Sequence, residues 1–138
     1  MNPNSKPAIA LVDNHPAVRE ALAQLLEDNG FTVLARASGR SEELDISSNQ
    51  PDLMLVDISL GDEDGLAIVE NMQLPGIPVV VCSTHEEPEY VRRALNAGAR
   101  GYVSKRDAGQ YLARAIRDVL NGWVMISLRA ADDLSDNI

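Results

Sequence analysis

The sequence has one cysteine, few basic residues and no long hydrophobic run. The single Cys82 excludes an internal disulfide and, because it lies in an apolar stretch, indicates a buried thiol in a reducing compartment. The apolar runs are too short to cross a bilayer or to form a signal peptide. The net charge of -9 argues against a nucleic-acid surface, since phosphate contacts need clustered Lys and Arg. We therefore expect a cytoplasmic protein with no membrane contact and no direct binding to nucleic acid.

The remaining composition fits one globular domain of 138 residues, with 45% hydrophobic and 24% charged residues. Short apolar runs typical of strands alternate with stretches of helical periodicity. The strands are expected at 8–12, 31–35, 53–56, 77–82 and 101–105. The helices are expected at about 18–29, 41–44, 66–72, 86–96 and 107–120. This alternation predicts an α/β fold with right-handed βαβ units and one doubly wound, five-stranded parallel sheet. The flavodoxin-like strand order 2-1-3-4-5 suits five strands.

The apolar run at 53–56 leads directly into Asp57. A continuous run of this kind predicts a strand covered on both faces, in the centre of the sheet. Asp57 would then lie at the carboxyl edge of the sheet, where ligands bind in open α/β folds. A simple cap on the following turn is the alternative interpretation of this carboxylate.

The other strands bring further polar groups to the same edge: Asp13 and Asn14 after the first, Ser83 and Thr84 at the fourth, and Lys105 at the fifth. Each has an ordinary explanation alone, but all of them directly follow buried strands. Two close carboxylates repel unless a cation lies between them, and Mg2+ prefers such oxygen ligands. A metal, an amine, a hydroxyl and a carboxylate nucleophile are the groups that phosphoryl transfer requires.

These residues resemble the receiver domain of two-component response regulators, particularly the NarL/FixJ (LuxR-type) subfamily. The resemblance runs from about Pro7 to Ser127. It is carried by the segments 12–16 (VDNHP), 55–57 (LVD) with 64–65 (DG), 81–83 (VCS) and 98–105 (GARGYVSK).

The resemblance implies a phosphorelay function in transcription regulation. Asp57 would accept a phosphoryl group from a phosphohistidine of a sensor histidine kinase or phosphotransfer protein. Such a receiver is a phosphoacceptor that assists its own phosphorylation and dephosphorylation rather than an enzyme. It would switch the face formed by the fourth helix, fifth strand and fifth helix, and so control an output domain or partner.

The resemblance also assigns roles to single residues. Asp13, Asn14, Asp57 and the backbone carbonyl of Ser59 would hold Mg2+. Ser83 and Lys105 would bind the phosphoryl group. Tyr102 would be the switch aromatic, although an amphipathic tyrosine at a strand edge is the alternative. Ser59 and His85 would tune dephosphorylation, with an ordinary exposed loop histidine as the alternative for His85.

Asn14 departs from the family pattern, which has a second acidic residue there. An amide oxygen brings no charge, so weaker Mg2+ binding is expected. This leaves open an atypical receiver that binds its partner without phosphorylation.

An aspartyl phosphatase is disfavoured because Ser59 stands where its second Asp is needed. A flavin carrier is disfavoured because no phosphate-cradling loop follows the first strand.

We expect residues 1–6 to be a disordered N-terminus, 7–127 the receiver domain and 128–138 a tail or the start of a linker. Any DNA binding would need an output domain that this sequence does not encode. Receivers of this kind often form homodimers through their helices. Contacts of that kind and a solvated surface are alternatives for four arginines on the last two helices, Arg92, Arg93, Arg114 and Arg117.

Overall fold

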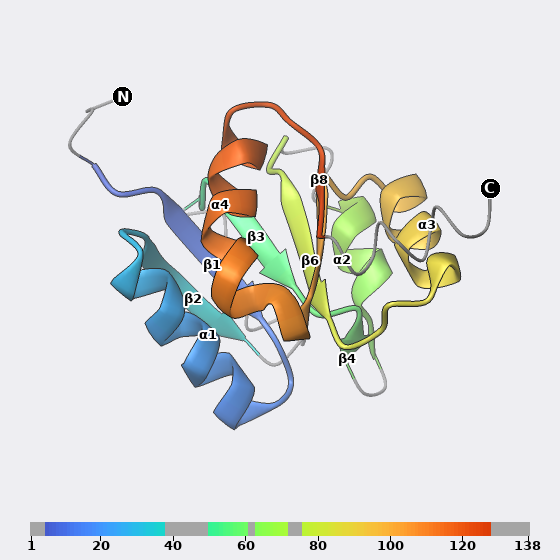
Figure 1. The fold of residues 1–138 in the computed structure, drawn as a ribbon, viewed down its shortest axis with the longest axis horizontal. Coiled ribbons are helices and arrows are strands. Elements are labelled where there is room, and N and C mark those ends of the chain that lie inside the picture. The colour runs from blue at the N-terminus through green and yellow to red at the C-terminus, as the bar shows by residue number, and fades with distance from the viewer. Residues whose placement is uncertain (1–4, 38–49, 61–62, 72–75, 128–138) are drawn as a thin grey trace.

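The computed structural model describes residues 5–37, 50–60, 63–71 and 76–127. The expected helical turns at 41–44, the tail at 128–138 and most of the N-terminal segment at 1–6 lie outside the described residues. Figure 1 shows a central sheet with helices packed against both of its faces. No described helix is both long enough and apolar enough to pass through a membrane.

The main sheet is parallel and has the order β2-β1-β3-β6-β7-β8. Its first five strands reproduce the predicted order 2-1-3-4-5, which confirms the flavodoxin-like topology. The strands are β1 (Ala8–Val12), β2 (Thr32–Ala37), β3 (Leu53–Val56), β6 (Val79–Ser83), β7 (Gly101–Ser104) and β8 (Met125–Ile126).

The sixth strand, β8, corrects the prediction of five. Met125 N–H donates to the Arg100 carbonyl at 3.0 Å, and Ser127 N–H donates to the Tyr102 carbonyl at 2.9 Å. Two residues are too few to show a periodic pattern, so a strand that depends on its neighbour's hydrogen bonds leaves no signal in the sequence. A small hairpin, β4 (Ser59–Leu60) with β5 (Glu63–Asp64), also replaces part of the turn expected after Asp57.

The helices cover the two faces of the sheet in pairs. Helices α1 (Pro16–Asp28) and α4 (Ala108–Leu120) pack on the face with Leu53 and Leu55. Helices α2 (Gly65–Asn71) and α3 (Pro88–Ala97) pack on the face with Met54 and Val56. All four residues of β3 are at most 1% exposed. The expected central strand buried on both faces is therefore confirmed.

All four described helices begin within two residues of the expected positions. The helix expected from Glu86 begins at Pro88, whose fixed φ and missing N–H suit the first helical position. It ends at Gly98, which has a φ of 114° and so takes the left-handed cap conformation that favours glycine. The last helix begins at Ala108, after the short 3-10 helix η2 (Lys105–Asp107).

Candidate functional site

Three charged side chains meet at the carboxyl edge of the sheet. Lys105 Nζ lies 2.8 Å from Asp13 Oδ2 and 2.9 Å from Asp57 Oδ2. Asp13 and Asp57 are 1% and 4% exposed, so both carboxylates are buried. The amine thus bridges two carboxylates that come from separate strands.

The pairing of the strands explains why the two acids are neighbours. Val12 of β1 is paired with Val56 of β3, so the next residue of each strand is an aspartate. Asp57 N–H donates to the Val12 carbonyl at 3.0 Å and fixes this register beyond the strand ends. The adjacency depends on a parallel pairing between segments more than forty positions apart.

Gly65 allows α2 to begin against the backbone that carries Asp57. A Cβ atom placed on Gly65 would lie 2.5 Å from the Asp57 carbonyl oxygen and 2.5 Å from Ile58 Cα. Both are backbone atoms and cannot rotate away. Only glycine fits here, because the reason is close approach of the backbone rather than an unusual φ.

The charge state of Lys105 follows from its two partners. Burial of the amine disfavours its charged form, but hydrogen bonding and attraction to Asp13 and Asp57 more than offset this. The net result is a raised pKa for Lys105. The amine is therefore a fixed positive charge at neutral pH.

Asp13 is held in place from the α1 side. Its Oδ1 accepts the His15 backbone N–H at 2.9 Å, and its carbonyl accepts from Arg19 Nη1 at 3.1 Å. The His15 ring also lies 3.4 Å from Asp13 Oδ1. The contacts of His15 and Arg19 that position Asp13 were not predicted from the sequence, although both residues are close to Asp13 in the chain.

The donor atoms at this edge match a hard divalent cation. Ligand atoms of Asp13, His15 and Asp57 lie within 4.8 Å of one another. Asn14 Oδ1 is buried and has no hydrogen-bond partner among the described residues, and Asp13 Oδ2 is buried with the Lys105 amine 2.8 Å away. Oxygen ligands suit Mg2+, whereas an imidazole suits later transition metals. The acidic cluster could hold a metal, and its two carboxylates and orphaned amide oxygen fit Mg2+. Ser59 lies in β4, and its side chain is outside the described residues.

Ser83 and Tyr102 lie on neighbouring strands, where Ser83 ends β6 and is fully buried. Ser83 Oγ accepts the His85 N–H at 3.1 Å. Tyr102 is 0% exposed, and its hydroxyl donates to the His85 carbonyl at 2.6 Å. Burial raises the pKa of Tyr102 well above its usual range, while a hydrogen bond with the Ser83 side chain acts in the opposite direction. The structure therefore shows Tyr102 in a buried position.

The loop after β6 carries a second polar cluster that the sequence did not reveal. Glu86 accepts hydrogen bonds from Arg106 and from the Ser104 hydroxyl. Glu86 stands next to Glu87 in the chain, and adjacent acidic residues are typical of a solvated surface. Nothing in its spacing indicates a contact with residues eighteen and twenty positions away.

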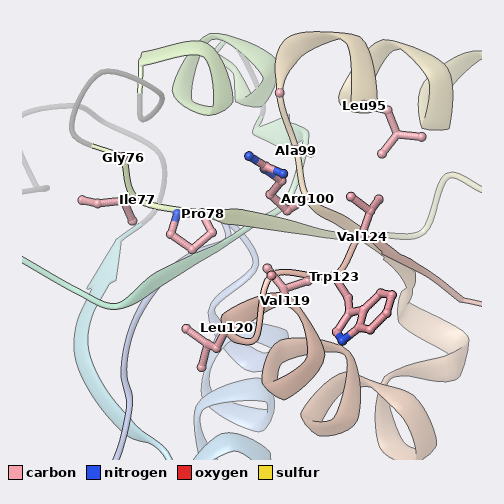
Figure 2. Close-up of a pocket in the computed structure, with 12 residues that line it drawn as sticks. Gly76, Ile77, Pro78, Leu95, Ala99, Arg100, Val119, Leu120, Trp123 and Val124 are labelled. Atoms are coloured by element: carbon pink, nitrogen blue, oxygen red, sulfur yellow. The ribbon is translucent and has the colours of Figure 1, made fainter. Parts of the chain in front are cut away.

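A groove lies at the other edge of the sheet. It has a volume of about 920 Å³ and is lined by residues that precede β6, β7 and β8. Figure 2 shows Arg100, Leu120, Trp123 and Val124 among the residues around it. Because these positions are at the amino ends of the strands, the groove is separate from the site at Asp57.

Comparison with known proteins agrees with this geometry. Residues 9–117 match the family described as the response regulator receiver domain. The chain is 38% identical to the transcriptional regulatory protein UhpA of Salmonella typhimurium over 117 residues, covering 83% of this chain and 59% of UhpA. It is 34% identical over 119 residues to a putative transcriptional regulator of Pseudomonas aeruginosa, covering 84% of this chain and 58% of that protein.

A solved structure shows the same fold over almost the whole chain. It is the LuxR-family two-component response regulator of Aurantimonas sp. SI85-9A1, with a TM-score of 0.87 and 30% identity. The match covers 96% of this chain and 98% of that one. This chain spans less than two thirds of the length of the curated relatives above. The chain belongs to the response regulator receiver family, as a receiver domain of the kind found in NarL/LuxR-type transcriptional regulators.

Proposed function

We propose that this receiver takes a phosphoryl group onto Asp57 from the phosphohistidine of a sensor histidine kinase or phosphotransfer protein. The observation that carries the proposal is the buried triad, in which Lys105 Nζ lies within 3 Å of carboxylate oxygens of Asp13 and Asp57. A structural ion pair needs one carboxylate for one amine. Here two carboxylates share one amine, so the triad keeps an excess negative charge that can receive a cation and a phosphoryl group.

In the proposed reaction, one carboxylate oxygen of Asp57 forms a bond to phosphorus. The bond between phosphorus and the donor histidine nitrogen breaks, and the imidazole leaves with that electron pair. The product is an acyl phosphate on Asp57. Lys105 can turn from Asp57 to the incoming phosphoryl oxygens while it keeps its contact with Asp13. The Ser83 hydroxyl is suited to donate a hydrogen bond to the same group.

Asp13, Asn14, Asp57 and the Ser59 carbonyl would hold Mg2+. When bound, the ion would neutralise negative charge on the carboxylates and the phosphoryl oxygens. Ser59 and His85 would then influence how readily water reaches the acyl phosphate. This chain's own residues would thus assist phosphorylation and dephosphorylation, without turning over a substrate as an enzyme does.

The signal would leave through the face formed by α3, β7 and α4. Movement of Ser83 toward the phosphoryl group would pull on the loop that holds the Tyr102 hydroxyl, so the tyrosine would act as the switch. Residues 7–127 would form this receiver unit within a cytoplasmic regulator. In a longer protein of the UhpA type, the controlled partner would be a DNA-binding output domain.

Incubation with acetyl phosphate or phosphoramidate and Mg2+ tests the phosphoacceptor. Intact-mass measurement should show one added phosphoryl group on the wild type and none on Asp57→Ala. The matched control is Asp52→Ala, which removes a carboxylate outside the site. Labelling of Asp57→Ala equal to the wild type would show that another residue is the acceptor.

A phosphorylation-independent binding module is the second candidate, and Asn14 is the observation that favours it. Its amide oxygen supplies no charge to a metal site. This candidate predicts no saturable Mg2+ binding at millimolar concentrations. Titration of the wild type and Asn14→Asp distinguishes the two functions. Binding by the wild type favours the phosphoacceptor, and binding only by the variant favours the module.

A further inference from the structure

The loop from Ser83 to Glu87 is tied to β7 and to the start of η2 by several contacts. The Tyr102 hydroxyl donates a hydrogen bond to the His85 carbonyl, and the Ser83 hydroxyl accepts one from the His85 N–H. The His85 ring stacks on Tyr90 with ring centres 4.2 Å apart. These contacts fix His85 in the middle of the loop. They do not connect the loop to the segment 104–106, which carries Lys105.

Glu86 makes that connection. Arg106 Nη2 lies 2.6 Å from Glu86 Oε1, and Arg106 Nε lies 3.0 Å from Glu86 Oε2. This two-point geometry is the strong form of a charge-assisted hydrogen bond. The hydroxyl of the fully buried Ser104 donates to the same carboxylate. The Glu86 side chain is 17% exposed and the Arg106 side chain 63%, so water weakens the ion pair with Arg106 more than the bond from the buried Ser104 hydroxyl.

The two partners of Glu86 flank Lys105 in the chain. Ser104 is the residue before it and Arg106 the residue after it. One carboxylate therefore fastens the loop of Ser83 to both neighbours of the amine that bridges Asp13 and Asp57. Ser104 N–H also donates to Ser127 Oγ at 3.1 Å, which extends the network to the end of β8.

We propose that Glu86 is a positioning residue whose bonds to Ser104 and Arg106 hold the Ser83 loop in its resting position and so limit the phosphorylation of Asp57. The inference rests on the proposed function, in which Ser83 moves toward the phosphoryl group. The loop cannot carry Ser83 inward without shifting Glu86 against partners fixed in β7 and η2. Weakening these bonds raises the population of the inward loop, and the apparent affinity for a phosphoryl group rises with that population.

The first experiment follows the unphosphorylated protein, so it does not depend on the proposed function. Amide hydrogen exchange of residues 83–87 is compared among the wild type, Glu86→Gln and the control Glu89→Gln. Glu89→Gln removes an exposed charge from the first turn of α3. Faster exchange in Glu86→Gln alone, by about fivefold or more, supports the role of Glu86. Exchange equal to that of the wild type overturns it.

The second experiment measures the response at Asp57. Beryllofluoride, a phosphoryl mimic for carboxylates, should bind Glu86→Gln about fivefold more tightly than the wild type. Acetyl phosphate should label the variant correspondingly faster. A merely structural role predicts weaker or unchanged binding, and either result overturns the proposal.

A charge swap provides the specific control. Glu86→Arg combined with Arg106→Glu should return the beryllofluoride affinity toward the wild-type value, whereas each single variant should not. If both single variants bind beryllofluoride with the wild-type affinity, and the double variant does not, the proposed pairing of Glu86 with Arg106 is contradicted. If the wild type takes up neither beryllofluoride nor phosphoryl groups, the proposed function fails. Hydrogen exchange then decides separately whether Glu86 holds the loop.

Discussion

The pKa values of single residues at this site depend on their surroundings as well as on the type of residue. Lys105 keeps its charge despite burial because two carboxylates face it, and its pKa is raised. Cys82, one position before Ser83, shows the opposite balance. Burial dominates over the nearby charges and raises the pKa of its thiol from 9.0 to about 12. The thiol is therefore a poor nucleophile and serves as a small apolar core residue.

The raised pKa of Cys82 predicts a loss of stability in alkaline solution. Since the folded protein keeps the thiol proton to about pH 12, only the unfolded chain releases it above pH 9.0. The stabilising contribution is complete below pH 9.0 and decreases as the pH rises toward about 12. Between pH 9 and 10 this thiol should lower the free energy of unfolding by about 1 kcal/mol.

Urea unfolding of the wild type and Cys82→Ala over this pH interval measures the effect. The alanine variant will be less stable throughout, so the slope with pH is the informative quantity. For Cys82→Ala, the free energy of unfolding should fall less steeply with pH. The remaining slope should come mainly from tyrosines, whose usual pKa is higher. Parallel slopes for the two proteins would contradict the assigned origin.

At the scale of elements, the site depends on how closely neighbouring segments approach. Gly65 begins α2 against the backbone of Asp57 and Ile58, where a Cβ would come within 2.5 Å of both residues. Asp57 and the helix that begins against its backbone are therefore fixed together. Movement of either would be transmitted to the other.

Gly65→Ala should destabilise the protein by about 1–3 kcal/mol, because the overlap is with backbone that can shift only as a unit. It should also reduce labelling of Asp57 by acetyl phosphate, since the carboxylate moves with that backbone. Thermal unfolding and intact-mass labelling check the two effects.

Gly109→Ala in α4 is the matched control: its Cβ meets nothing within 4 Å. There, alanine should stabilise the protein by about 0.4–1 kcal/mol, because it lowers the conformational entropy of the unfolded chain. Equal effects at both glycines would rule out the packing explanation.

Considered as a whole, the molecule places its chemistry at one edge of the sheet and an open groove at the other. The net charge of -9 and the clustered carboxylates favour binding of cations over anions. Lys105 supplies one internal cation, which accounts for the burial of Asp13 and Asp57. A divalent ion would add to this neutralisation and should stabilise the folded state.

Magnesium should therefore raise the stability of the wild type. At a concentration about tenfold above its dissociation constant, a ligand specific for the folded state stabilises by about 1.4 kcal/mol. Urea unfolding with Mg2+, and with the same ionic strength from NaCl, measures this gain. Asp57→Asn should abolish it, whereas Glu89→Gln should leave it unchanged. An equal gain from NaCl would indicate general screening instead of a site.

The buried strands and most of the residues at the candidate site could be predicted from the sequence. Apolar runs at 53–56 and 79–82 specify strands buried on both faces, because such runs can be removed from water only between two helix layers. The residue after each run then falls at the carboxyl edge, so Asp13, Asp57, Ser83 and Lys105 could be placed together without coordinates.

Only the tertiary structure decided β8, the close fit at Gly65 and the contacts of Glu86. β8 is two residues long and exists through hydrogen bonds to β7, so no periodicity marks it. Gly65 looks like any turn glycine until the backbone of Asp57 lies against it. The partners of Glu86 lie on separate segments, and a carboxylate that bonds across segments reads along the chain as an ordinary surface charge. Periodicity reports which residues are buried, whereas pairing between distant segments depends on distances that exist only in the folded chain.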